Sequence, residues 1–152
     1  MLCRRHILTG LALLPASALV PRVGVAGQSD IYAEQGIAIR GADAVAYFQA
    51  GAYAPGDPRY AVMWRGATWH FTSMENRDAF EMDPGTFCPR FGGYCAYALA
   101  EGQLVASDPA AFTVYEGRLY LNYSMQVRRQ WAADKSRYIA QAEANWPGVL
   151  NN

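Results

Sequence analysis

Two cysteines and one histidine are the residues best suited to chemistry beyond the first 26 positions of the chain. Cys88 and Cys95 frame the segment Cys-Pro-Arg-Phe-Gly-Gly-Tyr-Cys, and His70 is the single histidine after residue 26. Six intervening residues with two glycines can bend back far enough for the two sulfurs to meet. A disulfide, two unpaired thiols and shared ligation of a metal ion are therefore three open alternatives.

A metal site here would use Cys95, His70 and Cys88. Sulfur ligands favour copper(I) over magnesium or calcium, so copper is the expected metal. Met63, Met74 and Met82 could add thioether ligands. However, Met74 and Met82 also fall where core-facing residues of a helix are expected. Methionine commonly fills gaps in cores, so core packing is the alternative role for both.

The glycine pair between the cysteines predicts a loop that approaches a ligand closely. Gly92, Gly93 and Tyr94 are therefore candidate cofactor-binding residues, with neighbouring aromatic side chains as walls for a flat or apolar ligand. No catalytic residue is assigned, since the chain after residue 26 has no phosphate-binding glycine loop, no nucleophile elbow and no paired histidines. A redox or nucleophilic enzyme that uses Cys95, with His70 as its partner, is the rival hypothesis.

Two β-hairpins, each followed by a helix, are the elements expected to position these residues. Aromatic and β-branched runs flank a Gly-containing corner at 60–71 and again at 112–123. A capping box at 72–75 predicts a helix to about residue 81, and helices are also expected at 94–100 and 124–145. Residues 42–48 fit either a short helix or a strand. The fold class is a small single α+β domain.

An offset of 51 positions relates the two hairpin-helix stretches and predicts an internal structural repeat. Glycine at a corner and serine at a helix start also recur for purely local reasons, so chance similarity is the alternative. The matched pairs are Trp64/Tyr115, Gly66/Gly117, Trp69/Tyr120, Ser73/Ser124, Met74/Met125, Arg77/Arg128, Phe80/Trp131 and Asp83/Asp134.

The first 26 residues have the order of an export signal. Arginines at 4 and 5 precede an apolar run over 7–20 and small residues over 23–27. The run is too short to span a bilayer, and the arginine pair resembles the twin-arginine signature of bacterial export. A periplasmic location is expected, with no membrane span. Without the signal the chain has ten basic and thirteen acidic residues, a net charge of −3, which disfavours a nucleic-acid partner.

Three segments of the chain resemble the YHS-domain proteins, and most closely a branch of small exported bacterial members. The segments are 43–48, 69–80 and 92–98. The resemblance covers about 37–147. Together with the signal pattern it divides the chain into an export signal (1–26), a tether (27–36), a YHS-like domain (37–147) and a tail (148–152).

What the resemblance implies about function is a binding module, because better-known YHS and related domains are regarded as metal-binding. Their cysteines correspond to Ala46, Thr72 and Asn76, none of which is a thiol, whereas Cys95 belongs to the motif of the branch itself. The expected function is binding of a metal ion, copper above all, or of another small ligand. A thiol-dependent redox enzyme and a structural or protein-interaction domain are the alternatives, and no protein partner is indicated.

Overall fold

Two hairpins organise the chain in the computed structural model, which describes residues 28–152. The predicted export signal lies outside these residues. The first hairpin pairs β3 (Asp57–Trp64) with β4 (Ala67–Phe71), and the second pairs β5 (Asp108–Tyr115) with β6 (Arg118–Asn122). Both corner residues of each hairpin have positive φ, at Arg65-Gly66 and Glu116-Gly117. Such corners suit the right-handed twist of the flanking strands, and glycine adopts the second position at little cost.

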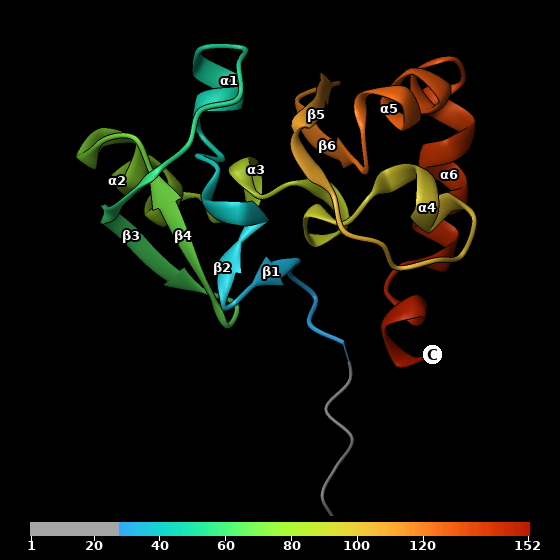
Figure 1. The fold of residues 1–152 in the computed structure, drawn as a ribbon, viewed down its shortest axis with the longest axis horizontal. Helices are drawn as coiled ribbons and strands as arrows, with labels where there is room; N and C mark the ends of the chain where they lie inside the picture. The colour runs from blue at the N-terminus through green and yellow to red at the C-terminus, as the bar shows by residue number, and fades with distance from the viewer. Residues whose placement is uncertain (1–27) are drawn as a thin grey trace, which may run out of the picture.

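Helices follow each hairpin. The first is succeeded by α2 (Met74–Met82) and α3 (Pro84–Phe87), and the second by α5 (Met125–Ala132) and α6 (Lys135–Asn145). In Figure 1 the first hairpin lies on one side of the molecule and the second on the other, with α3 between them. The predicted α+β class is confirmed.

The internal repeat is confirmed in strand pairing. The pairs Ala61↔His70 and Trp64↔Ala67 of the first hairpin recur, 51 positions later, as Phe112↔Leu121 and Tyr115↔Arg118. Both hairpins also have a register shift at the same place. It lies between Asp57 and Ala61 in the first hairpin and between Asp108 and Phe112 in the second. Because a register slip of one residue would turn every side chain to the opposite face, equal registers give the two hairpins the same inner face.

The helix starts repeat as well. Ser73 caps α2 by accepting a hydrogen bond from the amide of Asn76, and Ser124 caps α5 through the amide of Val127. The predicted capping box therefore has its cap at Ser73, one residue later than expected, because the Thr72 hydroxyl is donated elsewhere.

The repeat extends further upstream than the sequence comparison predicted. Three consecutive residues with positive φ form η1 (Ile39–Gly41), and three more, 91–93, end η2 (Arg90–Gly93). Here the offset is 52, because the connection to the following hairpin is one residue longer in the first unit. Each left-handed turn leads into a short helix, α1 (Ala46–Gln49) or α4 (Ala96–Ala100). We call residues 39–82 and 91–132 the first and second units.

Asp43 ties the first unit together. Its carboxylate is fully buried and accepts hydrogen bonds from the amides of Val45 and Ala46, from the amide and hydroxyl of Thr72, and from the side-chain amide of Asn76. These donors come from the start of α1, the end of β4 and the first turn of α2. A buried carboxylate is tolerated only when its lone pairs are occupied in this way.

Cys95 holds the equivalent position in the second unit. Its Sγ accepts from the amide of Ala98 at the start of α4, at 3.5 Å, and from the amide of Tyr123 after β6, at 3.2 Å. A thiol thus stands where the first unit has the Asp43 carboxylate.

The N-terminal segment departs from the expected tether at 27–36. It carries β1 (Ala33–Glu34), which pairs with β2 (Ile37–Ala38), and β2 lies parallel to β4, giving the sheet order β1-β2-β4-β3. Ile31 is 1% exposed and Tyr32 is also buried, since both pack into the core. The segment was predicted to be a tether because it shows no clear periodicity, but Ile31 and Tyr32 anchor it to the core.

Two hydrogen bonds hold the first described residues, one to the C-terminal end and one to Tyr94. The amide of Gln28 donates to the carbonyl of Leu150, and the hydroxyl of Tyr94 donates to the carbonyl of Ser29. The expected tail at 148–152 is largely η3 (Gly148–Asn151), in which Val149 is buried.

The core contains one large aromatic side chain of the same helix position from each unit. Phe80 packs against Trp69, and Trp131 packs against Tyr120, so the matched residues at offset 51 make matched contacts. The largest fully buried side chains include Trp69, Trp131, Tyr47, Phe71, Phe80 and Ile31.

Two further sequence expectations about helices are wrong. The helix expected at 124–145 is broken at Asp134, whose backbone is not helical and whose carboxylate pairs with Arg137. Met74 and Met82 were expected in the core but are 50% and 87% exposed, because α2 turns Asn76 and Phe80 inward instead.

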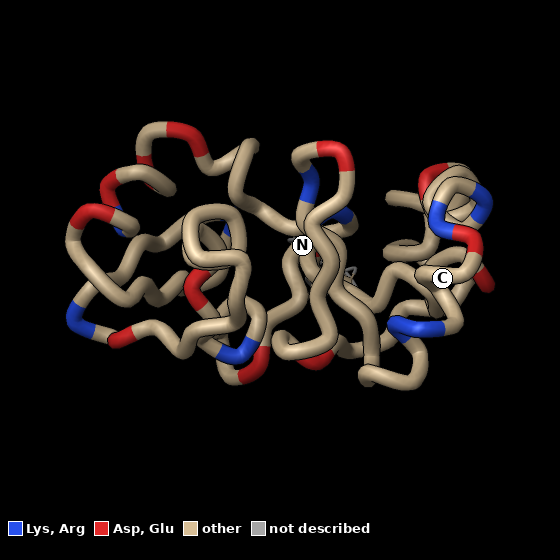
Figure 2. The backbone as a smooth tube through the Cα atoms, turned by 90° about the horizontal axis from the view of Figure 1, so that it is seen from above, with Lys and Arg blue, Asp and Glu red and all other residues tan. Residues whose placement is uncertain are grey.

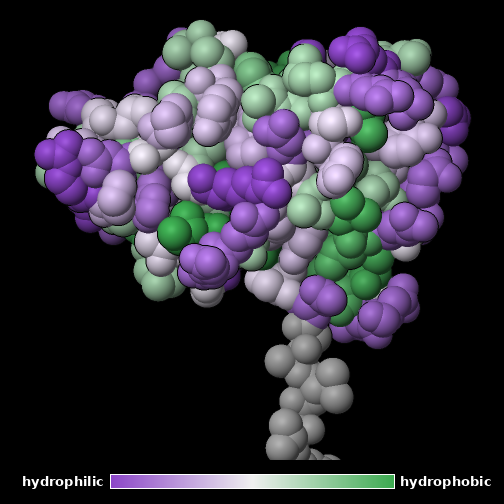
Figure 3. All heavy atoms as spheres, in the orientation of Figure 1, coloured by the Kyte–Doolittle hydropathy of each residue, from purple (hydrophilic) through white to green (hydrophobic). Residues whose placement is uncertain are grey.

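Acidic and basic residues both occur throughout the backbone drawn in Figure 2. On the face shown in Figure 3 the largest group of strongly hydrophobic residues lies at the lower right, with smaller groups elsewhere. Within residues 28–152 no helix is both long enough and apolar enough to cross a membrane.

Candidate ligand-binding site

Cys95 lies inside the domain. It is 1% exposed, and burial raises the pKa of its thiol, against the smaller lowering effect of the amides that donate to it. The thiol is therefore protonated at neutral pH, whereas the thiolate is the form that attacks substrates and ligates metals. Its visible role is to cap α4.

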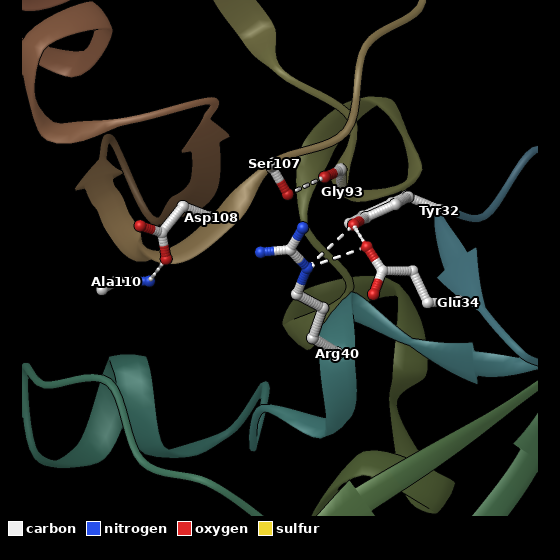
Figure 4. A network of polar contacts seen from close by, with 7 residues as sticks. All are labelled: Tyr32, Glu34, Arg40, Gly93, Ser107, Asp108 and Ala110. Carbon is white, nitrogen blue, oxygen red and sulfur yellow. Dashed lines mark hydrogen bonds and ion pairs between the residues drawn. The ribbon is translucent and has the colours of Figure 1, made fainter.

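His70 lies in a different place, on the face of β4 opposite Trp69 and Phe71, as its strand position predicted. It lines a cavity of about 360 Å³ with Glu34, Arg40 and several backbone segments. Figure 4 shows the neighbouring network, in which Arg40 Nε donates to Glu34, at 2.8 Å, and to the hydroxyl of Tyr32. Burial is the main cause that raises the pKa of Tyr32 to about 12, so this hydroxyl stays protonated. We call this the His70 cavity.

Cys88 lies at a third place, between the two units. It lines a cavity of about 230 Å³ and an adjoining one of about 210 Å³. The walls come mainly from the corner of the first hairpin, the segment from α3 to η2, the start of β6 and Trp146 at the end of α6. We call the two together the Cys88 cavity; its lining side chains include Asp30, Trp64, Arg65, Cys88, Arg90, Phe91, Glu116, Arg118 and Trp146.

The Cys88 thiol is neutral. Burial raises its pKa to about 12, and the nearby guanidinium groups of Arg65 and Arg90 offset only part of that rise. Its Sγ lies 3.5 Å from the carbonyl oxygen of Pro89, to which it donates. Cys88 therefore offers a small, weakly polar wall rather than a nucleophile.

The three residues expected to bind a metal are thus distributed over three places. His70 lines its own cavity, Cys88 lines another, and Cys95 is enclosed at the cap of α4. Across residues 28–152 no three side chains of His, Cys, Asp or Glu are grouped so as to hold a metal ion. Both cysteines are free thiols, which decides the open question of a disulfide in this structure.

The glycine pair mainly makes room for the chain itself. A Cβ on Gly92 would lie 1.8 Å from the carbonyl oxygen of Asp30, and one on Gly93 would lie 2.5 Å from Ile39. Tyr94 uses its hydroxyl to hold Ser29. Of the three predicted cofactor-binding residues, Gly92 lines the Cys88 cavity and the other two line none of the described cavities.

Sequence reasoning missed the three arginines of the Cys88 cavity. Arg65 is a hairpin corner residue, Arg118 opens β6, and Arg90 follows the Cys88-Pro89 pair. They are 53 positions apart at the extremes, and corner residues are usually solvated. Arg90 alone lies in a segment that the sequence singled out, the one between Cys88 and Cys95.

The three positions that the YHS resemblance assigns to cysteine lie close together. Ala46, Thr72 and Asn76 all donate to the Asp43 carboxylate, and Asn76 also donates to the Thr72 hydroxyl at 3.2 Å. These residues form a hydrogen-bonded cluster with one carboxylate and no thiol.

Comparison of the chain with protein-family models, with curated proteins and with solved structures found no match. The arrangement of the cavities therefore provides the basis for a functional conclusion.

Proposed function

We propose that this chain is an exported, YHS-like binding module that holds a small ligand in the Cys88 cavity. The observation that carries the proposal is that the walls of this cavity come from both units of the repeat. Trp64 and Arg65 come from the first unit, Arg118 comes from the second, and Cys88 lies on the segment that joins them. Ligand sites commonly form between packed units, where neither unit fills the space alone.

A small ligand suits this geometry better than copper does. Copper(I) would need two or more soft ligands within bonding distance, and the candidate residues Cys95, His70 and Cys88 are separated by the fold. Both thiols also have raised pKa values, which opposes the thiolate that a metal requires.

Two observations support the YHS-like and exported parts of the proposal. Thr72 and Asn76 lie 29 and 33 positions beyond Asp43, yet they donate to its carboxylate together with Ala46, as expected if these three positions correspond to a ligand site in YHS domains. The order of charged, apolar and small residues over 1–26 supports export.

A binding screen on isotope-labelled protein tests the site. Amide and indole signals in a proton–nitrogen correlation spectrum are followed while a set of neutral and charged fragments is added. We expect the responding signals to come from Cys88, Gly92 and the indoles of Trp64 and Trp146, because these groups line the cavity.

Two glycine variants provide a matched pair. Gly85 lines the Cys88 cavity and has ordinary backbone angles, so Gly85→Leu adds volume there without backbone strain. Gly148→Leu adds the same side chain in open space elsewhere. Fragment shifts should disappear in the first variant and persist in the second. Shifts confined to His70 and Glu34, or unchanged in Gly85→Leu, would refute the proposed site.

A further inference from the structure

Three guanidinium groups line the Cys88 cavity, from Arg65, Arg90 and Arg118, against two carboxylates, those of Asp30 and Glu116. Arg65 and Asp30 form an ion pair at 3.3 Å, and both side chains are about half exposed. That pair is close to neutral as a unit. The charge of the remaining wall therefore depends on Arg90, Arg118 and the Glu116 carboxylate, which are two positive groups against one negative group.

Arg90 has unused hydrogen-bonding capacity. Its Nη2 donates to Glu143 at 2.9 Å, and its guanidinium lies over the ring of Phe91. Its Nε, however, is buried and has no acceptor within the described residues. A buried charged donor without an acceptor is unfavourable, and a ligand oxygen satisfies it only if the Arg90 side chain turns Nε toward the cavity.

Arg118 is also available. Among residues 28–152 no carboxylate or other acceptor pairs with its side chain, and it lines both parts of the cavity. Two guanidiniums that share one cavity, with Nε unsatisfied on one and all donors free on the other, suit the oxygens of a carboxylate or phosphate.

Size and the other walls limit the ligand further. The two parts of the cavity, about 230 and 210 Å³, are each smaller than the roughly 300–1,000 Å³ of pockets for drug-sized molecules. Trp64, Phe91 and Trp146 add aromatic surface, and the neutral Cys88 thiol introduces no competing negative charge.

We infer that the ligand is a small organic anion, with its oxyanion group bound by Arg90 and Arg118 and its apolar part against the tryptophans. The inference rests on the proposed function and specifies the ligand class for that same site. It involves no bond-making step.

The test titrates the purified chain with three probes of similar size: benzoate, phenyl phosphate and the neutral benzamide. We expect both anions to shift the cavity signals in a saturable manner, and benzamide to bind at least several-fold more weakly. Comparing benzoate with phenyl phosphate distinguishes a carboxylate from a phosphate head group.

Arginine variants locate the charge effect. Arg118→Gln should weaken binding of the preferred anion about tenfold, as expected for one charge-assisted hydrogen bond. Arg129→Gln is the control, because Arg129 is equally exposed but lies on α5 outside the cavity. Arg90→Lys keeps the charge and loses the guanidinium geometry, so it should also weaken binding. Thermal melting of each variant verifies that the fold is retained.

The outcomes separate the two proposals. If benzamide binds as tightly as benzoate, and Arg118→Gln changes neither, the cavity is a ligand site but the anion inference is wrong. If neither these probes nor the fragment set shift the cavity signals, both proposals are wrong.

Discussion

Replacement of the buried carboxylate of Asp43 by an amide should destabilise the domain severely. In the native protein one oxygen, Oδ1, accepts from the amides of Val45 and Ala46, and the other, Oδ2, accepts three hydrogen bonds. Asp43→Asn keeps the shape of the side chain but turns one acceptor into a donor. In either orientation the new NH2 group faces N–H or O–H groups that donated to the carboxylate in the native protein.

The magnitude follows from the donors that lose their acceptor. The Thr72 hydroxyl can rotate and accept, and the Asn76 amide can reorient, but the backbone amide of Thr72 cannot move without breaking the end of β4. An unsatisfied buried donor costs roughly 1–3 kcal/mol, and the loss of charge-assisted bonds adds to this. We expect a decrease of about 3 kcal/mol in the free energy of unfolding, a large part of the roughly 5–15 kcal/mol typical of a small domain.

Urea-induced unfolding, followed by tryptophan fluorescence, measures this change. Trp69 and Trp131 are fully buried and report on the first and second units, respectively. Asp83→Asn is the matched control, because Asp83 also accepts from an amide and a hydroxyl, both of Thr86, but is exposed. The control should lose less than about 1 kcal/mol. An Asp43→Asn variant as stable as the control would show that the carboxylate does not hold the first unit together.

Three other predictions concern the glycine turn, the thiols and the metal. Gly92→Ala should destabilise the domain by more than Gly117→Ala, because its Cβ would collide with Asp30 whereas Gly117 faces open space. The urea midpoints of the two variants measure the difference, and equal midpoints would contradict the clash. Burial raises the pKa of the Cys88 thiol from 9.0 to about 12 on folding. The stabilisation from the buried neutral thiol is therefore complete below pH 9 and is lost as the pH rises toward 12. Urea midpoints between pH 8 and 11 should therefore fall less steeply for Cys88→Ala, and parallel curves would refute this. The purified protein should hold far less than one copper per chain by elemental analysis, because the candidate ligands are separated; one copper per chain that disappears in Cys95→Ser would restore the metal hypothesis.

Local sequence signals predicted the hairpins and the helices after them because their determinants are local. Gly66 and Gly117 set the corners, and Ser73 and Ser124 set the helix starts. A constant offset of 51 then transferred one unit onto the other. The same approach failed at Asp134, where a backbone angle stops the helix although no glycine or proline occurs there.

The site was less predictable because tertiary packing creates it. Cys95 reads as a reactive thiol in sequence, and only its burial and its bonds to backbone amides show it as a helix cap. The upstream extension of the repeat was missed because Asp43 and Cys95 differ in type and lie at an offset of 52 rather than 51. Arginines on separate corners carry no common pattern until the fold brings them to one cavity.

The hydrogen bonds made by Gln28 and Ser29 restrict where the predicted signal could be cut off without disturbing the fold. Ser29 holds Tyr94, and Gln28 holds Leu150, so these residues are structural although they follow the predicted signal by only two or three positions. A peptidase that removed them would leave the Tyr94 hydroxyl and the last turn without partners. If the predicted signal is removed, processing that preserves this fold must therefore cut before Gln28, and the intact mass of the purified protein reports where the cut is made.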